Sequence, residues 1–203
     1  VSAAALNASS RITMLAHYGP RTGSAYENDP AGLVFWQAGA YPGCVTTSNV
    51  GTGQTYATIT LGVAALPQTL TGHSCVVIRD GATYAEQVTV RNFTNNGSSI
   101  TIFADPASGL TPVVSPPAAS TAAFQIANAS VNIQGIDADI GQNIPYGVWA
   151  SSAYVQLSSI AISTIGGQGI YTAGVRISSW SSVSNSTVTA WNAHGFWIDG
   201  TRT

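Results

Sequence analysis

A pattern that recurs three times between residues 131 and 200 constrains the fold of this chain more than any other feature. Each copy starts with short strands in which apolar and polar residues alternate, and it then passes through a turn of small residues. It closes on a glycine followed by two bulky apolar residues, as in Gly147–Trp149, Gly169–Tyr171 and Gly195–Trp197. The glycines are 169 − 147 = 22 and 195 − 169 = 26 residues apart. A loose period of this size, made of strands without helices, indicates a β-solenoid.

Stacking explains why such copies would fold together. One copy cannot bury its own apolar side chains, but coils about 4.8 Å apart pair each strand with its counterpart above and below. Six alternating apolar residues are then expected to face inward: Val131, Ile133, Ile136, Val155, Leu157 and Ile160. The alternative is an antiparallel sandwich of short strands, but the Asn-Gly signal of a tight hairpin occurs only earlier, at Asn96-Gly97.

The chain carries little charge. Charged residues make up 7% of its 203 residues, it has no lysine, and its net charge is −2; an average domain has roughly 25%. This composition argues against nucleic acid or an anionic membrane as a partner. No apolar run is long enough to predict a membrane span. Serine, threonine and asparagine supply the polar surface, which suits an extracellular or cell-surface protein.

Two further features bear on that localisation. Cys44 and Cys75 are either a disulfide, which secretion would favour, or two buried thiols. Glycosylation sequons begin at five asparagines: Asn7, Asn92, Asn96, Asn128 and Asn185. The chain begins Val-Ser-Ala without a basic, apolar leader, so we expect a mature or excised piece.

The sequence divides into two parts. Residues 1–53 form an amino-terminal extension with two predicted strands, Ile12–Leu15 and Leu33–Ala38, and could dock on a neighbour. Residues 54–203 are the predicted solenoid, with coils from about Cys75 onward. A helix is predicted over 56–66, because apolar residues recur there at helical spacing before Pro67. It would cover the apolar end of the first coil.

Several strings between Gly51 and Gly141 match one known superfamily in order. They are Tyr56–Ile59, the Gly-x-x-Tyr-x-Glu-x-Val string of Gly81–Val88, Ile100–Ile102, Phe124–Ile126 and Val131–Ile136. This region, under half of the chain, resembles the pectin lyase-like superfamily and is most similar to its pectin methylesterase branch. The resemblance implies a right-handed parallel β-helix with an amino-terminal capping helix.

The same resemblance speaks against esterase chemistry. Those enzymes use two aspartates on adjacent coils, one as nucleophile and one as acid. The first lies in a Gln-Asp-Thr string, whose counterpart here keeps Gln168 but holds Gly169. The second would fall in Ala193–Ile198, which has no carboxylate. Without both groups, attack on an ester and protonation of its leaving group have no agents.

Other residues leave enzymatic alternatives open. Asp137 and Asp139 lie on one face of a strand, so they could bind Ca²⁺ or act as acid and base in a glycosidase, or simply form a polar edge. A polygalacturonase-like enzyme would have a Gly-His-Gly motif with a basic residue nearby, and His194-Gly195 is a fragment of that motif. Arg79 and Arg176 are candidates for the base of a lyase.

We therefore expect a non-catalytic structural or adhesive module, which could stack head-to-tail into a fibre through an open carboxyl-terminal coil. The alternatives are a fragment of a polysaccharide lyase or glycosidase, and a carbohydrate-binding module. The latter would use four aromatic residues: Trp149, Tyr171, Trp180 and Trp197. Trp149, Tyr171 and Trp197 are expected to form one ladder along successive coils, facing either into the core or outward.

Overall fold

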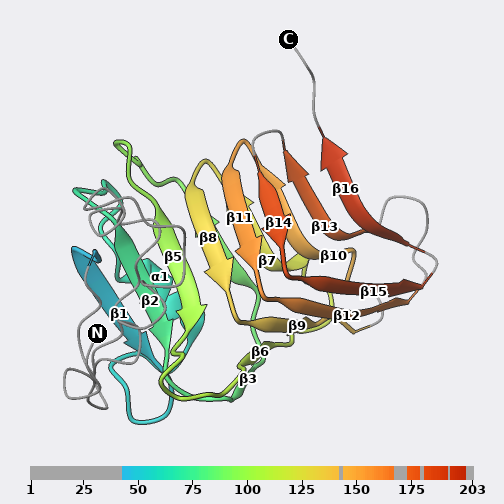
Figure 1. The fold of residues 1–203 in the computed structure, drawn as a ribbon, viewed down its shortest axis with the longest axis horizontal. Coiled ribbons are helices and arrows are strands. Elements are labelled where there is room, and N and C mark those ends of the chain that lie inside the picture. Colours follow the sequence, from blue (N-terminus) through green and yellow to red (C-terminus); the bar gives the residue numbers. More distant parts are fainter. Residues whose placement is uncertain (1–42, 142–143, 167–172, 179–180, 192, 200–203) are drawn as a thin grey trace, which may run out of the picture.

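The chain folds into a parallel β-solenoid with three parallel sheets (Figure 1). The computed structural model describes residues 43–141, 144–166, 173–178, 181–191 and 193–199. The first sheet contains β1 (Thr46–Val50), β2 (Ser74–Ile78), β5 (Ile100–Ala104), β8 (Ser130–Gln134), β11 (Tyr154–Ser158) and β14 (Ser182–Ser184). The second contains β3 (Thr83–Tyr84), β6 (Val113–Val114), β9 (Asp137–Asp139), β12 (Ala161–Gly166) and β15 (Thr187–Trp191). The third contains β4 (Val88–Arg91), β7 (Ala122–Ala127), β10 (Tyr146–Ser151), β13 (Ala173–Ser178) and β16 (His194–Asp199).

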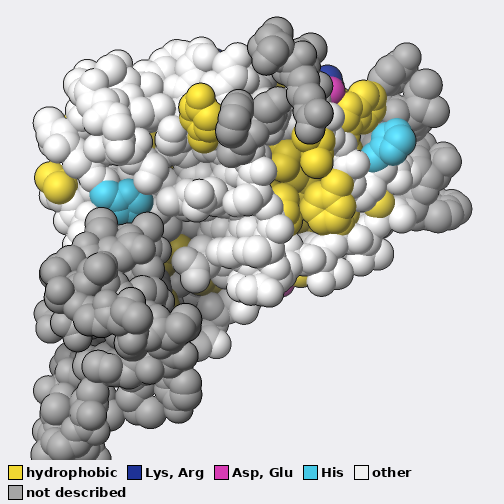
Figure 2. Space-filling view, turned by 45° about the horizontal axis from the view of Figure 1, so that its top comes forward, with side chains coloured by type: hydrophobic (Ala, Val, Ile, Leu, Met, Phe, Trp, Pro, Cys, Tyr) yellow, Lys and Arg dark blue, Asp and Glu magenta, His cyan; other side chains and the backbone are white. Residues whose placement is uncertain are grey.

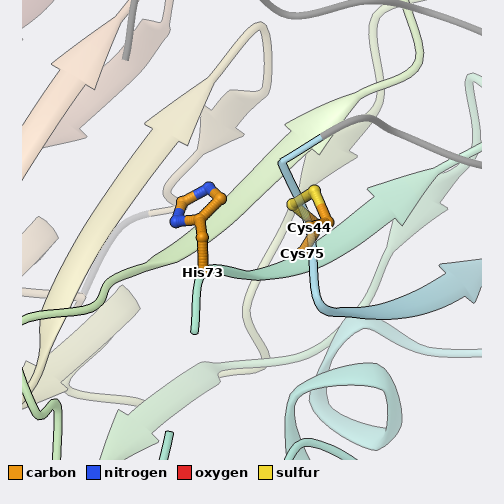
Figure 3. Close-up of side chains that lie close together, drawn as sticks. All are labelled: Cys44, His73 and Cys75. Atoms are coloured by element: carbon orange, nitrogen blue, oxygen red, sulfur yellow. A yellow bond between two sulfur atoms is a disulfide. The ribbon is translucent and has the colours of Figure 1, made fainter. Parts of the chain in front are cut away.

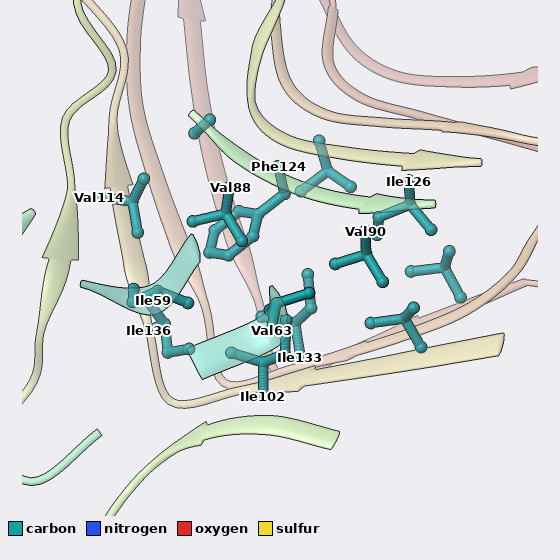
Figure 4. Packing of buried hydrophobic residues seen from close by; sticks show 14 of the residues in the cluster. Ile59, Val63, Val88, Val90, Ile102, Val114, Phe124, Ile126, Ile133 and Ile136 are labelled. Atoms are coloured by element: carbon teal, nitrogen blue, oxygen red, sulfur yellow. The ribbon is translucent and has the colours of Figure 1, made fainter. Parts of the chain in front are cut away.

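The core is made by residues that alternate with polar ones along each strand. All six residues predicted to face inward are at most 3% exposed. Figure 4 shows such side chains packed between the sheets, among them Val90, Phe124 and Ile133. Alternation decides this because successive side chains of a strand point to opposite faces. The sandwich alternative is excluded for the described strands, since every strand pair is parallel.

The register differs from the simple sequence alignment at the last coil. Val155 lies beside Val131, as expected, but Val183 lies beside Leu157 rather than Val155. The third copy is therefore displaced by one inward position. A two-residue displacement keeps the same side chains inward, so the apolar pattern tolerates it.

Single residues with left-handed backbone make the corners of the coils. Asn92, Asn128 and Ser152 turn the chain from the third sheet into the first, with φ of 62°, 52° and 49°. Ser159 and Asn185 do the same between the first and second sheets, with φ of 52° and 47°. Asparagine and glycine adopt this conformation more readily than other residues, which explains the composition of these bends.

The helix α1 (Ile59–Ala64) is shorter than predicted. It starts late because Thr58 caps it, accepting a hydrogen bond from the Leu61 N–H, while Tyr56 bridges to Val50. The Glu86 carboxylate accepts the N–H groups of Ile59 and Thr60 at 2.7 and 3.0 Å, and so satisfies two orphan donors of the first turn. None of the described helices could cross a membrane.

The solenoid begins earlier than the predicted boundary at residue 53. β1 lies within the predicted extension, yet it pairs in parallel with β2 over its whole length, from Thr46 beside Ser74 to Val50 beside Ile78. Short polar strands of this kind give a weak sequence signal. The two strands predicted at Ile12–Leu15 and Leu33–Ala38 lie outside the described residues.

Candidate functional site: an aromatic patch on the third sheet

The third sheet carries a row of large side chains on its outer face. Trp149 in β10 lies beside Arg176 in β13, and Arg176 lies beside Trp197 in β16. The predicted ladder of Trp149, Tyr171 and Trp197 is therefore wrong in its middle coil, which presents Arg176 at that position. Tyr171 and Trp180 lie outside the described residues.

Two tightly packed glycines lie at this register. A Cβ on Gly147 would come within 2.6 Å of the Gly174 carbonyl oxygen, and one on Gly174 within 2.9 Å of the Gly195 carbonyl oxygen. Both distances are too short for a real Cβ, so neither position accepts a larger residue without a shift. Gly147 and Gly174 are equivalent positions of their coils, because Val148 pairs with Val175. The sequence pattern predicted Gly169 instead, because Gly169-Ile170-Tyr171 and Gly174-Val175-Arg176 both begin with a glycine and an apolar residue.

The row faces away from the core. Val148 and Val175, the neighbours of Trp149 and Arg176, are completely buried in the main core. Trp149 and Trp197 are only half-buried and pack in a separate cluster with Tyr146, Ala122 and Ala173. Figure 2 shows hydrophobic side chains gathered beside a histidine on the side of the molecule that holds the carboxyl-terminal strands. We call Tyr146, Trp149, Arg176, His194, Trp197 and Asp199 the aromatic patch.

Arg176 is the centre of the aromatic patch. Its Nε donates to Asp199 Oδ2 at 2.7 Å, and its Nη1 donates to the Tyr146 hydroxyl at 2.9 Å. Its guanidinium carbon lies 4.9 Å from the centroid of the Trp197 ring and 5.6 Å from that of Tyr146. The hydrogen bond to Asp199, followed by that to Tyr146, raises the pKa of Arg176. The guanidinium is thus fixed, charged and laid over aromatic rings.

The remaining rings extend this arrangement. Tyr146 and Trp149 are stacked, with centroids 5.8 Å apart and planes inclined by 27°. His194 meets Trp197 edge-on at 5.2 Å. Tyr146 is buried, so the two partly exposed indoles of Trp149 and Trp197 are the rings of this group that a ligand can reach. Fixed aromatic rings beside polar groups can bind sugars, because the C–H faces of sugars pack on aromatic faces and their hydroxyls need hydrogen-bond partners.

The structure brings Arg176 and His194 to one sheet, where both contact Trp197, but it places the predicted aspartate pair on another sheet. Asp137 and Asp139 are on the second sheet, where their carboxylates bind the next coil: Asp137 accepts the Ala161 N–H at 2.8 Å and Asp139 accepts the Ser163 hydroxyl at 3.2 Å. Arg176 is on the third sheet and pairs with Asp199. Neither aspartate belongs to a three-residue group suited to a metal ion among the described residues. Gln168 and Gly169 lie outside those residues.

The polar residues of the Gly81–Val88 string hold the first coils together. Asp80, just before it, accepts the Thr52 N–H and the Tyr84 hydroxyl, each at 2.7 Å. Burial raises the pKa of Asp80, but these hydrogen bonds outweigh it, so the pKa is lowered. The pKa of Tyr84 is raised by burial and by its hydrogen bond to Asp80. Together with Glu86 at the helix start, these contacts give the string a structural role.

Arg79 belongs to the same structural region. Its Nη1 donates to Asp105 Oδ2 at 2.7 Å, and its Nε and Nη2 donate to the Asn49 side-chain oxygen at 3.1 and 2.8 Å. Asp105 is only 6% exposed. The arginine therefore ties β1, β2 and the end of β5 together, which leaves it poorly suited to act as a base.

Three comparisons with known proteins gave no match to this chain. A scan against protein-family models found no match, and neither a search of curated proteins nor a search of solved structures found a similar chain. The resemblance to the pectin lyase-like superfamily thus stays a prediction.

A second cluster lies on the first sheet, at the other end of the solenoid. Cys44 and Cys75 form a disulfide, and His73 lies close to both sulfurs (Figure 3). The ring nitrogens of His73 contact the hydroxyls of Ser99 and Thr101, each at 3.0 Å. Burial lowers the pKa of His73, partly offset by a hydrogen bond with the Ser99 backbone. As a disulfide, the sulfurs tie the start of the solenoid to β2 and are not thiolate ligands.

The sequons also have a structural reason. Asn92, Asn96, Asn128 and Asn185 are all exposed and all have positive φ. Three of them turn coil corners, and Asn96 turns the chain before Gly97. Asparagine is favoured there by backbone conformation alone, whether or not it carries a glycan. Asn7 lies outside the described residues.

Sequence reasoning missed one further hollow, a groove of about 300 Å³ between α1 and β4. Thr60, Val63, Gln68, Thr89 and Arg91 contribute to its lining. Its residues come from a helix face and a sheet edge that are far apart in sequence, so no local sequence motif could predict the groove. Arg91 is the one charged residue that lines it among the described part of the chain, so it offers no acid–base pair.

Proposed function

We propose that this chain is a non-catalytic adhesive module of an extracellular or cell-surface protein, and that it binds polysaccharide through the aromatic patch. The observation that carries the proposal is the register that aligns Trp149, Arg176 and Trp197 across three successive coils, outside the core. A rigid solenoid holds these side chains in fixed positions, so little conformational entropy is lost when a ligand binds.

The candidate catalytic side chains make contacts within the solenoid, and this supports a module without catalysis. A lyase or glycosidase needs a base and an acid that reach one substrate, whereas Asp137 and Asp139 bind the next coil on one sheet and Arg176 is paired on another. We expect methyl-esterified pectin to yield no methanol. Polygalacturonate with Ca²⁺ should yield no unsaturated uronate absorbance. Turnover that is lost in Arg176→Ala would contradict this.

The extracellular placement rests on two observations. The Cys44–Cys75 disulfide is typical of proteins that fold in an oxidising compartment. The low charge, with exposed asparagine and serine in its place, gives a surface that is polar without attracting nucleic acid. Localisation of the tagged protein, with and without cell permeabilisation, would test this proposal.

Binding is tested by titrating the purified protein with a panel of soluble polysaccharides while tryptophan fluorescence is recorded. The proposal expects at least one to bind, and expects Trp149→Ala and Trp197→Ala each to weaken binding about tenfold. Tyr154→Ala is the matched control, because Tyr154 is 59% exposed but lies on the first sheet. A panel without any binder would overturn the proposal.

We also propose that the solenoid is right-handed, with α1 as its end cap, as in the pectin lyase-like superfamily. Connections between parallel strands of one sheet are right-handed in about 98% of cases, which supports the handedness. The contacts of α1 with β1, β2 and β4, and the burial of Ile59 and Val63, support the cap. An experimental structure tests both statements directly.

Head-to-tail stacking is a second proposed function, and the last described coil favours it. Phe196 and Ile198 in β16 are 49% and 67% exposed, although their partners Val175 and Ile177 in β13 are buried. Such an apolar coil edge could be covered by a second copy of this chain. The proposal expects the wild type to form polymers visible by electron microscopy, and expects Ile198→Asp to form none. A native protein with further coils, visible as a larger intact mass, would contradict stacking.

A further inference from the structure

We infer that the aromatic patch takes an extended neutral glycan that runs along the solenoid axis, and that Arg176 is a positioning residue and not an anion receptor. This inference rests on the proposed glycan binding and adds the class and direction of the ligand. It is carried by the spacing of the two tryptophans and by the pairing of Arg176.

The spacing comes from the register. Trp149 and Trp197 are both in register with Arg176, one coil on either side of it. Neighbouring strands lie about 4.8 Å apart, so the two indole positions are about 9–10 Å apart along the axis. That is close to the length of one disaccharide in an extended chain. Every second sugar of such a glycan can therefore stack on a tryptophan, with its length crossing the strands.

The charge balance argues for a neutral ligand. Arg176 and Asp199 are the one basic and the one acidic side chain among the Arg, Lys, Asp and Glu residues of β10, β13 and β16, and they pair with each other at 2.7 Å. Nη1 of Arg176 is also engaged, with the Tyr146 hydroxyl. A uronate carboxylate would have to displace Asp199 to form a similar pair and would meet repulsion from it.

Arg176 then acts through the rings. Its guanidinium lies over both Trp197 and Tyr146, and Tyr146 stacks on Trp149. The chain of contacts Trp149–Tyr146–Arg176–Trp197 thus fixes both indoles relative to each other. Asp199 holds the guanidinium through the hydrogen bond that it accepts from Nε. Loss of Arg176 should weaken binding by freeing the rings, without changing which ligand charge is preferred.

The test measures dissociation constants for cello-oligosaccharides and for galacturonate oligomers of two to six sugars, at low and high salt. We expect the neutral series to bind more tightly, with affinity that rises up to about three sugars, the shortest length that reaches both tryptophans. This affinity should depend little on salt. Trp149→Ala and Trp197→Ala should each cost about tenfold and remove this length dependence, and Tyr154→Ala should change neither. Urea unfolding checks that each variant is folded.

Asp199→Asn gives the sharper readout. It frees the charge of Arg176, so galacturonate oligomers should bind this variant more tightly than the wild type, by several-fold at low salt, while neutral oligomers change little. A wild type that prefers galacturonate in a salt-sensitive way overturns this inference but leaves polysaccharide binding intact. Absence of binding to every glycan overturns both proposals.

Discussion

Two arginine–aspartate pairs with the same N–O distance of 2.7 Å lie at opposite ends of this solenoid, in different surroundings. In the amino-terminal pair the side chains of Arg79 and Asp105 are 15% and 9% exposed; in the carboxyl-terminal pair those of Arg176 and Asp199 are 29% and 47% exposed. Arg79 binds further polar groups of the first coils, whereas Arg176 lies over aromatic rings at the surface. The same contact geometry therefore occurs in two different surroundings, one buried among polar groups and one exposed beside aromatic rings.

Breaking the buried pair should have the largest effect. Arg79→Met leaves Asp105 buried without its cation, so we expect the free energy of unfolding to fall by about 3 kcal/mol. Urea denaturation monitored by circular dichroism measures this. The double variant Arg79→Met/Asp105→Leu should recover part of the loss, because it removes the uncompensated charge. A change below about 0.5 kcal/mol in the single variant would mean that the two pairs do not differ.

The packing beneath the aromatic patch is tested by one glycine. Gly174→Ala places a Cβ against Val188 Cγ1 and 2.9 Å from the Gly195 carbonyl oxygen. We expect a loss of about 1–3 kcal/mol from overpacking, and a displaced Arg176 that weakens glycan binding. Gly195→Ala is the matched control, since a Cβ there meets nothing within 4 Å. Equal stability of the two variants would show that the register is not held at Gly174.

An Arg→Met substitution at the exposed pair gives the counterpart of Arg79→Met. Arg176→Met should change the free energy of unfolding by less than about 1 kcal/mol, because the pair is largely solvated. It should nevertheless alter the tryptophan fluorescence, since the guanidinium lies 4.9 Å from the Trp197 ring. A loss of stability as large as that of Arg79→Met would make Arg176 a structural residue and weaken the case for a binding patch.

The smallest effect concerns pH at the amino-terminal end. Burial lowers the pKa of His73, so the unfolded chain binds a proton more readily than the folded protein. The free energy of unfolding should therefore fall as pH drops below about 6.5, the ordinary pKa of histidine. The fall should end once pH is below the lowered pKa of His73 in the folded protein. Unfolding at about pH 7.5 and about pH 5 in wild type and His73→Gln measures this component. An identical pH response in both proteins would rule it out.

The sequence by itself determined the class of fold and which side chains face inward. Strand alternation is a local property, so Val131, Ile133, Val155 and Leu157 are assigned to the core by period alone. Corner asparagines such as Asn128 follow from local backbone preference in the same way. The sequence did not predict β1, because a short polar strand gives a weak signal. It predicted α1 too long, because Tyr56 bridges to Val50 instead of starting the helix.

Only the tertiary structure decided the register, and with it the site. Gly169 and Gly174 both precede apolar residues, and coils of unequal length leave the choice between them open. The pairing of β13 with β10 on one side and with β16 on the other makes that choice, and it places Arg176 between Trp149 and Trp197. Pairing between coils is non-local: every two-residue shift keeps the apolar face inward, and only packing between coils distinguishes one such shift from another.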